Sequence, residues 1–444
     1  MPGKSKSAAQ PHATILPRAL RMPRPKGARP LQETALLEPR PHDNLHLFNS
    51  LTGEKEPFRS LEDRVVSLYV CGVTPYDVGH LGHALTYVVY DVLRRWLEHT
   101  GNAVRHIQNI TDIDDDMVRK SSELGVSIAE LTERNHGLYL EEMDALNVLR
   151  PDAYPRVSDT MDEIIEMVQE LIDRGFAYEV DHYVFFDISK TPQFGVLAGM
   201  TVEELRNAPR TDMMPDEPDH LKQDALDFLI WQPSTAEGAS FESPWGPGRP
   251  GWHIECSAMG RASLGDRIDI HGGGRDLRYP HHDSEIVQSE CATGLGPYVQ
   301  YWVHNGTMNL DGVKMSKSLG NLVKVTELLA QGHTPDAIRL MLLGTHYRAD
   351  RDFAPAQLDD WEQLSAKLRA ASEARGGPTD QLRVQAYRTA FSNAMDDDLD
   401  TPTAIRVLEE IADGLEAGRL AAETSVPTLL ELADVLGLRL GREG

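Results

Sequence analysis

The chain has 444 residues, 41% of them hydrophobic and 25% charged, with a formal net charge of −25 at pH 7. This length favours two or three packed units over a single core. So acidic a chain is a poor candidate for non-specific nucleic-acid binding, although a local basic groove for RNA is compatible with it. No apolar run approaches the length of a membrane span, and three cysteines without a secretory segment predict a reducing, cytoplasmic setting.

The N-terminal residues differ in composition from the rest of the chain. The first 32 residues contain seven Lys and Arg, many Pro, and no acidic residue before Glu33. Such a segment cannot bury enough apolar surface to fold, and its prolines disfavour the amphipathic helix of a transit peptide. We therefore expect residues 1–44 to form a disordered basic tail.

The next segments predict alternating strands and helices. Residues 45–64 resemble a short hairpin, and an apolar strand follows at 65–71. A turn rich in Gly and Pro then leads into a helix whose apolar residues recur every three or four positions, ending at Gly101. A second strand is expected at 103–111. This alternation indicates an α/β fold with a doubly wound parallel sheet, whose ligands lie beyond the carboxyl ends of the strands.

The middle of the chain carries two more predicted helices and two irregular stretches. A capping box at Ser127 begins one helix, and 158–175 forms another with one apolar face. Residues 176–225 break into short pieces with Pro and charge, which suggests an insertion between the two halves of the sheet. Residues 231–250 are rich in Gly and Pro, and we expect a loop that forms an active-site wall.

The remainder of the chain is predicted to be helical. Thr334 followed by Pro335 is a good N-cap with proline in the first turn, and everything beyond it has helical patterning. The closing segment, from about 355 to 438, is expected to be an all-helical bundle.

The turn after the first strand is suited to binding phosphate. A strand that leads through a glycine-rich turn into a helix gathers free backbone N–H groups and the positive end of the helix dipole at one place. His80 and His83 lie in that turn, and Cys71 closes the strand. This arrangement predicts a nucleotide ligand.

Two motifs resemble those of a known enzyme class. His-Leu-Gly-His at 80–83 resembles the first ATP signature of class I aminoacyl-tRNA synthetases, and Lys-Met-Ser-Lys-Ser at 314–318 resembles the second. Either motif alone is weak, but both occur, in the right order and about 230 residues apart. The stretches at 248–259 and 269–286 are similar to the cysteine-activating branch. That branch holds cysteinyl-tRNA synthetases and the mycothiol-pathway ligases, which join cysteine to a glucosaminyl-inositol.

The resemblance covers residues 45–438 and implies a domain plan. A Rossmann-type class I catalytic domain is expected at 45–305, with its insertion at about 176–225. The lysine loop and a region contacting the tRNA stem would occupy 306–354. The helical bundle at 355–444 would follow without a separate anticodon-binding domain.

The resemblance also implies a zinc site made by Cys71, Cys256, His281 and Glu285. His281 and Glu285 are one helical turn apart, so both can face one ion, although each residue taken singly is more often simply packed in a core. Zinc binds a thiolate strongly, whereas a hydroxyl or methyl group cannot replace that soft ligand. A contact of this kind discriminates by roughly four to five decades, so no editing domain is required.

The family pattern assigns further residues to the cysteine pocket. Trp252 would provide a flat wall and His271 would lie near the metal. Cys291 has no motif around it and is expected to be a packed thiol, and His253 and His282 adjoin the pocket but are left outside the predicted site. The remaining expected substrate-binding residues are Gly72, Thr74, Thr86, Asn109 and Thr111.

The same pattern assigns the nucleotide site. His80 and His83 would donate hydrogen bonds to the α-phosphate while cysteine's carboxylate attacks it, and Lys314 and Lys317 would hold the β- and γ-phosphates on a mobile loop. Asp276 would bind the ribose hydroxyls, and Mg²⁺ is expected with the ATP. Gly82 and Gly274 complete the nucleotide-binding set.

Three possibilities remain for the function, with a monomer expected in each: two differ in the acceptor of the activated cysteine, and the third involves no reaction. His271, Glu285 and the intact sequence at 254–259 favour tRNA(Cys). The segments at 74–77, 80–84 and 346–350, and a chain that stops soon after the bundle, resemble the mycothiol ligases, which form an amide with a small amine. The third possibility is a non-catalytic paralogue that binds cysteine or zinc.

Overall fold

The computed structural model describes residues 44–77, 79–207, 218–315, 320–378 and 381–441. All of them belong to one compact unit, which spans His42–Gly444. The expected basic tail lies outside the described residues apart from Asn44, and so does Lys317.

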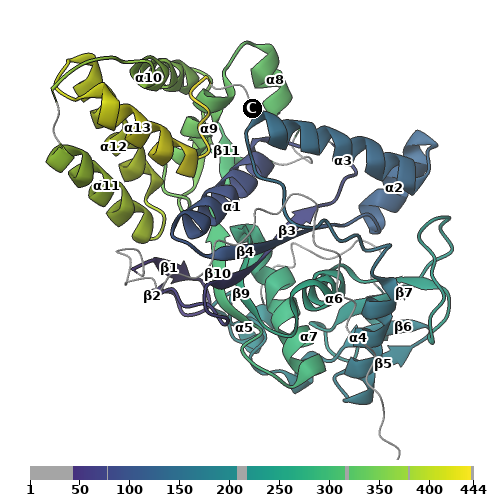
Figure 1. Ribbon diagram of the computed structural model, residues 1–444. Coiled ribbons are helices and arrows are strands. Elements are labelled where there is room, and N and C mark those ends of the chain that lie inside the picture. Colours follow the sequence, from purple (N-terminus) through teal and green to yellow (C-terminus); the bar gives the residue numbers. More distant parts are fainter. Residues whose placement is uncertain (1–43, 78, 208–217, 316–319, 379–380, 442–444) are drawn as a thin grey trace, which may run out of the picture. The chain divides into compact units, whose positions relative to one another are not determined.

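A four-stranded parallel sheet forms the centre of the fold (Figure 1). Its strands are β3 (Val65–Val73), β4 (Ala103–Ile110), β9 (Ile268–Gly274) and β10 (Val299–Asn305), in the order β10-β9-β3-β4. All three neighbouring pairs are parallel, which confirms the predicted sheet. The hairpin expected at 45–64 is also confirmed, as the antiparallel pair β1 (His46–Asn49) and β2 (Glu54–Pro57).

Helices cover both faces of the sheet. Alternate residues of β3 point to opposite faces, so Val66 and Leu68 pack in the cluster that contains helix α1 (Leu81–His99), while Tyr69 and Cys71 pack in the cluster that contains α6 (Trp252–Leu264). Helices α6 and α7 (Asp283–Thr293) also pack against each other. The sheet is thus buried on both faces, as expected of a doubly wound fold.

The segment between β4 and β9 begins with two helices. Helix α2 (Asp115–Leu124) precedes α3 (Ile128–Ala145), and the predicted capping box is confirmed. Ser127 Oγ accepts a hydrogen bond from the Glu130 N–H at 3.1 Å, and Glu130 accepts one from the Ser127 N–H at 3.2 Å. The helix predicted at 158–175 is present as α4 (Met161–Asp173), so it begins three residues later than expected.

The insertion is a small antiparallel sheet rather than short pieces followed by a loop. Its order is β5 (Ala177–Val180), β6 (Tyr183–Phe186), β7 (Phe228–Pro233) and β8 (Gly248–Pro250). The prediction of a loop over 231–250 is therefore wrong at both ends, since Trp231 pairs with Pro250. Proline at the end of an edge strand is permitted because its missing N–H faces away from the ladder. The other short elements are η1 (Ile188–Lys190), α5 (Val202–Asn207) and η2 (Asp219–Leu221).

A second small sheet follows the central one. Strands β11 (Met308–Leu310) and β12 (Val313–Lys314) form a hairpin, and β13 (Arg351–Phe353) pairs in parallel with β11. Two helices lie between them in sequence, α8 (Val325–Ala330) and α9 (Pro335–Leu343). Thr334 caps α9 as predicted, but the expectation of helix throughout the rest of the chain is wrong because β13 intervenes.

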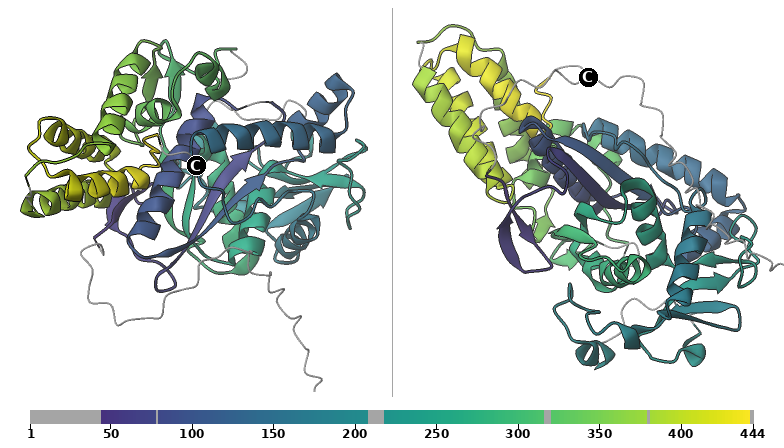
Figure 2. Two further views of the ribbon diagram at one scale, coloured as in Figure 1. Left: turned by 45° about the horizontal axis from the view of Figure 1, so that its top comes forward. Right: turned by 60° about the horizontal axis from the view of Figure 1, so that its bottom comes forward.

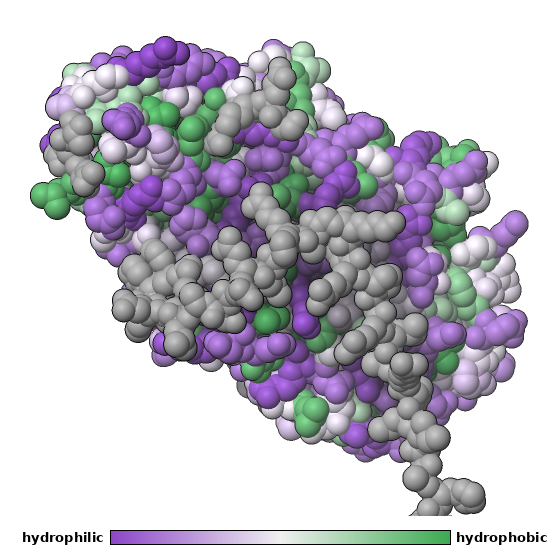
Figure 3. Space-filling model, in the orientation of Figure 1, coloured by the Kyte–Doolittle hydropathy of each residue, from purple (hydrophilic) through white to green (hydrophobic). Residues whose placement is uncertain are grey.

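The chain closes with the predicted helical bundle. It consists of α10 (Gln357–Ser372), α11 (Gln381–Asp396), α12 (Thr401–Glu416) and α13 (Ala422–Val435), which lie side by side in both views of Figure 2. In the described part of the chain, no helix combines the length and the apolar character needed to span a membrane. On the face shown in Figure 3, hydrophilic and hydrophobic residues are interspersed.

Candidate active site

A cleft of about 1210 Å³ opens at the carboxyl ends of the central strands. This is where a parallel α/β sheet binds its ligands. Most of the predicted site residues line it, including Cys71 at the end of β3 and Trp252 at the start of α6. The other predicted residues that line it are Gly72, Thr74, His80, Gly82, His83, Thr86, Gly274, Asp276 and Lys314.

A buried cluster of metal-binding side chains adjoins this cleft at Cys71. Cys71, His281, His282 and Glu285 each offer one donor atom, and these four atoms lie within 4.8 Å of one another. Cys71 Sγ is 3.3 Å from His282 Nε2 and 3.8 Å from Glu285 Oε1. His281 Nε2 is 3.2 Å from the same Glu285 oxygen. The predicted pair one helical turn apart therefore does converge on one point.

The structure places Cys256 beside this cluster as well. Its Sγ lies 3.9 Å from Cys71 Sγ, although the two residues are 185 positions apart in the sequence. Two thiolates on one tetrahedral zinc are separated by about 3.8 Å, given a Zn–S bond of about 2.3 Å. The sulfur separation and the set of thiol, imidazole and carboxylate donors thus fit a zinc ion.

Burial favours the neutral forms of these side chains in the protein alone. Desolvation, reinforced by Cys256 and Glu285, raises the pKa of the Cys71 thiol well above its ordinary value. Burial likewise lowers the pKa values of His281 and His282, with neighbouring histidines adding to the effect. Neutral imidazoles can bind a metal directly, whereas the thiol must lose its proton to the solvent when a cation binds.

Outer partners hold two members of the cluster in place. His271 Nε2 lies 2.9 Å from Glu285 Oε2, so the predicted pocket histidine binds the carboxylate on the side away from Cys71. The Trp252 ring stacks on the His281 ring with centroids 4.2 Å apart and planes at 22°. Contacts of this kind fix the orientation of ligating side chains.

Two histidines that the sequence interpretation left outside the site belong to it. His253 Nδ1 is 3.0 Å from His281 Nδ1, and His282 Nδ1 is 2.8 Å from His304 Nε2. The segment η4 (Arg278–His282) has an extended residue at Tyr279, after which both histidines of the doublet turn inward. The doublet itself was the available signal, but its spacing does not show which ring faces the cluster.

The helix start at α1 also lines the cleft. His80 is the N-cap of α1, and its Nδ1 accepts a hydrogen bond from the Gly82 N–H at 3.1 Å. The His80 and His83 rings stack with centroids 3.9 Å apart. A Cβ at Gly82 would lie 2.8 Å from the His80 ring, so a larger residue here would require that ring to move.

Gly72, next to Cys71, is held by two predicted substrate-binding residues. The Gly72 N–H donates to Asn109 Oδ1 at 2.8 Å, and the Asn109 amide donates to Thr111 Oγ1 at 3.1 Å. A Cβ on Gly72 would lie 1.6 Å from the Asn109 carbonyl oxygen, so only glycine fits between the strands here. Asn109 and Thr111 are both buried and support the strand end from behind.

The residue predicted to bind ribose, Asp276, contacts one of those predicted to bind phosphate, Lys314. Lys314 Nζ and Asp276 Oδ2 form an ion pair at 2.7 Å across the mouth of the cleft, and both side chains are about half exposed. A Cβ added at Gly274, two residues before Asp276, would lie 2.5 Å from that carboxylate. Lys317, the other predicted lysine, lies outside the described residues.

Sequence reasoning missed an acidic wall of the cleft at the start of α2. Asp114, Asp115 and Asp116 line it, and Asp115 forms an ion pair with Arg249. Burial, aided by Asp116 and Asp115, raises the pKa of Asp114 to about 7 against the hydrogen bond from the Met117 N–H. Three acidic residues directly after the second strand were the signal. Because like charges repel, phosphates are favoured at the start of α1 rather than here.

Two models of known protein families match this chain. Residues 57–363 match the catalytic domain of the class I (C) tRNA synthetases, and residues 390–441 match the DALR domain. The chain belongs to the class I (C) tRNA synthetase family, as the sequence motifs implied.

Curated relatives extend over most of the chain. A protein of Dehalococcoides mccartyi named cysteine–tRNA ligase is 42% identical over 404 residues, which are 89% of this chain and 86% of that protein. Proteins of the same name from Alkalilimnicola ehrlichii and Synechococcus elongatus are 44% and 43% identical, over 89% of this chain and 85% and 86% of their own lengths.

Solved structures share the fold. Mycobacterium tuberculosis methionyl-tRNA synthetase, in a complex with methionyl-adenylate, superposes with a TM-score of 0.59 at 16% identity, over 84% of this chain and 89% of that one. A putative arginyl-tRNA synthetase of Campylobacter jejuni gives a TM-score of 0.52 at 12% identity. The α/β class I architecture expected from the sequence is thus confirmed.

Proposed function

We propose that this protein activates L-cysteine with ATP and transfers it to the 3′ end of tRNA(Cys). The observation that carries the proposal is the joining of two sets of residues in one cleft. The thiol, imidazole and carboxylate cluster around Cys71 adjoins this cleft, and the predicted phosphate-binding turn at His80 lines it as well. The names of the curated relatives support the same acceptor.

The first reaction needs a charged nucleophile brought to a charged electrophile. A carboxylate oxygen of cysteine attacks the α-phosphorus of ATP, a P–O bond forms, and pyrophosphate leaves. His80 and His83 donate hydrogen bonds to the phosphate as negative charge builds on it, while Lys314 and Lys317 neutralise the departing pyrophosphate. Magnesium bound to the ATP would neutralise part of the same charge.

The second reaction uses the same cleft. A terminal ribose hydroxyl of tRNA attacks the carbonyl carbon of the adenylate, an ester forms, and AMP leaves. Asp276 binds the ribose hydroxyls of the ATP in this proposal. Because Asp276 and Lys314 form an ion pair in the structure, binding of ATP would exchange that pair for ribose and phosphate contacts.

Selection of cysteine is proposed to rest on the cluster. Zinc held by Cys71, Cys256, His281 and Glu285, with His282 in reach of the same position, would supply a soft ligand site for the substrate thiolate. Trp252 restricts the room beside it to a small side chain. Since every proposed site residue comes from one chain, we expect a monomer to be active, and its three free thiols suit the cytoplasm.

The test measures both half-reactions with purified protein. Labelled cysteine, ATP and deacylated tRNA are expected to give acid-precipitable, ribonuclease-sensitive label. Brisk cysteine-dependent pyrophosphate exchange without such label would direct the search to small amines such as glucosaminyl-inositol. Absence of exchange with bound zinc would support the non-catalytic alternative.

A lysine variant tests the assigned phosphate contacts. Lys317→Ala should retain zinc and abolish pyrophosphate exchange, because the charge on the departing pyrophosphate is then left without its partner. Lys190→Ala, which removes an exposed lysine of the insertion paired with Asp187, is the matched control and should retain exchange. Full activity of Lys317→Ala would show that the loop has a different role.

A further inference from the structure

The lysine of the ATP site sits on a hairpin whose tip is fastened to the rest of the fold. Strands β11 and β12 are joined by Asp311 and Gly312, both with positive φ (53° and 75°), and Lys314 pairs with Asn309 across the hairpin. The Gly312 N–H donates a hydrogen bond to Asp352 Oδ1 at 3.0 Å. Asp352 belongs to β13, so the turn is tied to a strand that lies 40 residues further along.

The base of the same hairpin is fastened by a second aspartate. Asp350 Oδ1 accepts hydrogen bonds from both the Thr307 N–H and the Thr307 hydroxyl, each at 2.8 Å. Thr307 directly precedes β11 and lines the cleft. Asp350 also forms an ion pair with Arg275, which begins η3 (Arg275–Leu277).

These contacts close a ring around the nucleotide end of the cleft. Arg275 is bonded covalently to Asp276, and Asp276 forms its ion pair with Lys314 at 2.7 Å. The hairpin backbone links Lys314 to Thr307, and Thr307 is hydrogen-bonded to Asp350. The predicted ribose residue and the predicted phosphate residue are therefore connected on one side by their own ion pair and on the other through Asp350.

We propose that Asp350 is a positioning residue, which holds the Lys314 hairpin and the Asp276 turn at a fixed separation through Thr307 and Arg275. The inference rests on the proposed roles of Asp276 and Lys314 in binding ATP. When ATP separates the side chains of Asp276 and Lys314, Asp350 still joins the two segments that carry them, through its contacts with Thr307 and Arg275.

The arrangement follows from the alternation along β13. Arg351 and Phe353 are buried, and β13 lies in register with β11 through Met308–Arg351 and Leu310–Phe353. Residues two apart on an extended segment share a face. Asp350 and Asp352 thus both lie on the exposed side, one at the base and one at the tip of the hairpin.

Energetic considerations separate this role from a merely structural one. The Asp350 and Arg275 side chains are 48% and 42% exposed, and ion pairs so exposed add little to stability. A misplacement of about 1 Å at a reacting group, in contrast, can slow a reaction by about 10²-fold. Loss of Asp350 should therefore reduce the reaction rate and leave the fold almost unchanged.

The experiment compares three variants in cysteine-dependent pyrophosphate exchange. Asp350→Ala removes all three contacts and is expected to lower kcat by about tenfold or more, with KM for cysteine unchanged because the metal-binding cluster is untouched. Asp350→Asn keeps an acceptor for Thr307 and should lose less. Arg275→Gln should match Asp350→Asn, and the double variant should lose no more than either single one.

A control variant and a second measurement, trypsin cleavage, test the role of Asp350 without relying on enzyme activity. Asp397→Asn breaks a similarly exposed ion pair with Lys55 and should change nothing. Trypsin cleavage after Lys314 should be accelerated several-fold in Asp350→Ala and unchanged in Asp397→Asn, because only the first releases the hairpin. Zinc content should equal that of the original protein in every variant.

Two results would overturn the inference. One is an Asp350→Ala protein with unchanged kcat and unchanged cleavage after Lys314. The other is a loss of zinc or a large fall in Tm that accounts for the lower activity. If the original protein shows no cysteine-dependent exchange, the proposed function fails instead, and the cleavage rates still decide whether Asp350 holds the hairpin.

Discussion

Two buried cysteines illustrate how position decides the chemistry of one residue type. Cys71 and Cys291 are 6% and 7% exposed. Cys71 lies among imidazoles and a carboxylate, whereas Cys291 lies in α7, where burial raises the pKa of its thiol to about 12, with Glu290 adding to the shift. Burial raises the pKa of both thiols, so the protonation state does not distinguish them. The difference comes from the neighbours and not from the degree of burial.

This contrast predicts the result of removing either thiol. Cys71→Ser should lower the zinc bound per chain from about one to well below one after dialysis, because an oxygen replaces the thiolate that zinc prefers. Elemental analysis of the purified protein measures it. Cys291→Ser is the matched control and should retain the metal, and equal zinc in both variants would show that the cluster does not hold the ion.

A second residue-scale prediction concerns pH. His106 in β4 is 4% exposed, and neither ring nitrogen has a hydrogen-bond partner in the described structure. Burial, reinforced by Arg94, lowers its pKa to about 3. Between pH 3 and the ordinary histidine value, the unfolded chain binds more protons than the folded one. The folded state is therefore stabilised at neutral pH, and this stability is lost as the pH falls below about 6.5.

His106→Leu should remove this dependence, because the buried side chain can no longer take up a proton on unfolding. Urea unfolding followed by circular dichroism should show the variant gaining about 3 kcal/mol relative to the original protein between pH 7 and pH 4. His220→Leu, which alters an exposed histidine of η2, should keep the original slope. Parallel pH profiles for all three proteins would contradict the assignment.

The sequence alone predicted site residues where spacing or motif determines geometry. His281 and Glu285 lie one turn apart, and their side chains meet as expected. The inward turn of His282 depends on the extended residue at Tyr279, and the Lys314–Asp276 pair depends on how separate segments pack. No local pattern encodes either of these. The assigned roles of Lys317 and of the cysteine-binding residues stay predictions.

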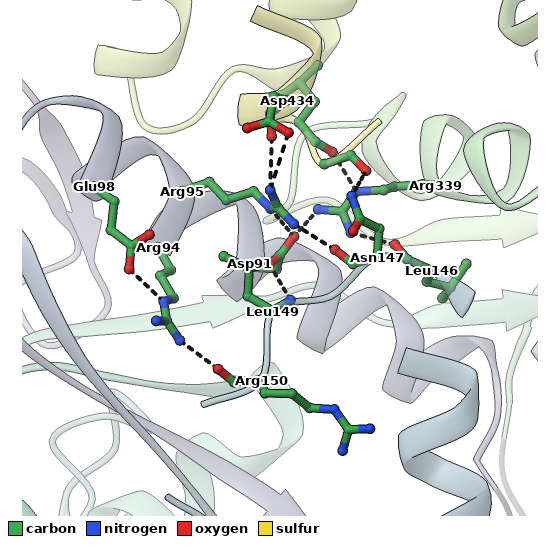
Figure 4. Close-up of polar contacts among 12 residues, drawn as sticks. Asp91, Arg94, Arg95, Glu98, Leu146, Asn147, Leu149, Arg150, Arg339 and Asp434 are labelled. Atoms are coloured by element: carbon green, nitrogen blue, oxygen red, sulfur yellow. Dashed lines mark hydrogen bonds and ion pairs between the residues drawn. The ribbon is translucent and has the colours of Figure 1, made fainter. Parts of the chain in front are cut away.

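At the scale of elements, a buried arginine joins four segments behind the sheet (Figure 4). Arg339 of α9 forms an ion pair with Asp91 of α1 and donates to the Leu146 carbonyl at 2.8 Å and to the Leu436 carbonyl. Leu146 and Leu436 are the C-caps of α3 and α13. One guanidinium thus compensates the negative ends of two helices as well as a carboxylate.

The surroundings of Asp91 show how this charge is tolerated. Burial raises the pKa of Asp91, but Arg339 and Arg95 outweigh that effect and hold its pKa below the ordinary value. Asp91 also accepts a hydrogen bond from the Leu149 N–H at 2.8 Å. A buried carboxylate with so many donors is stable only while all of them remain.

Arg339→Met should therefore destabilise the protein by about 3–5 kcal/mol, since it leaves Asp91 short of a partner and two helix ends uncapped. Chemical denaturation at pH 7.5 measures this. Arg406→Met changes an exposed arginine of α12 and should stay within about 0.5 kcal/mol of the original protein. A loss below 1 kcal/mol for Arg339→Met would mean that water takes the place of the guanidinium at Asp91 and at the two carbonyls.

Elements were predictable where one periodicity or cap dominates. Ser127 and Thr334 gave their helix starts because the capping chemistry is local. Strands β8 and β13 were missed because each has three residues and is defined by a partner strand. Short strands rich in Gly, Pro or charge carry no alternation long enough to recognise.

At the scale of the whole molecule, the bundle shares its core with the catalytic half. One buried cluster contains Leu68 of β3, Trp96 of α1 and Phe391 of α11. Trp96 Nε1 donates to Asp396 at 3.1 Å, and the Thr401 hydroxyl donates to the Leu343 carbonyl at 2.7 Å. The boundary predicted at residue 355 thus does not separate one core from another.

This shared core predicts that the bundle depends on the rest. A fragment of residues 355–441 should show no cooperative thermal transition by circular dichroism, because its apolar side toward α1 would face water. The full chain, as control, should lose bundle and sheet signals in one coincident transition. A fragment that unfolds cooperatively on its own would show that the bundle is an independent domain.

The fold class could be predicted from the alternation of strands and helices together with two motifs. These features are spread over most of the chain. The joining of the two halves did not follow, because contacts between residues hundreds of positions apart leave no periodic signature. Trp96 and Phe391, whose rings lie 6.2 Å apart, are an example. Each is an ordinary apolar position of its own helix.

The link from Arg339 to Leu436 has a consequence for how the protein is made. The acceptor Leu436 follows Arg339 by 97 positions, and Arg439 and Leu440, whose backbone N–H groups bind Asp336 at 3.0 and 2.8 Å, follow Asp336 by 103 and 104 positions. Helix α9 is therefore synthesised 97 to 104 residues before these partners of Arg339 and Asp336. A premature stop codon before Leu436 would release a chain that carries every proposed catalytic residue and still exposes a buried ion pair to cellular quality control.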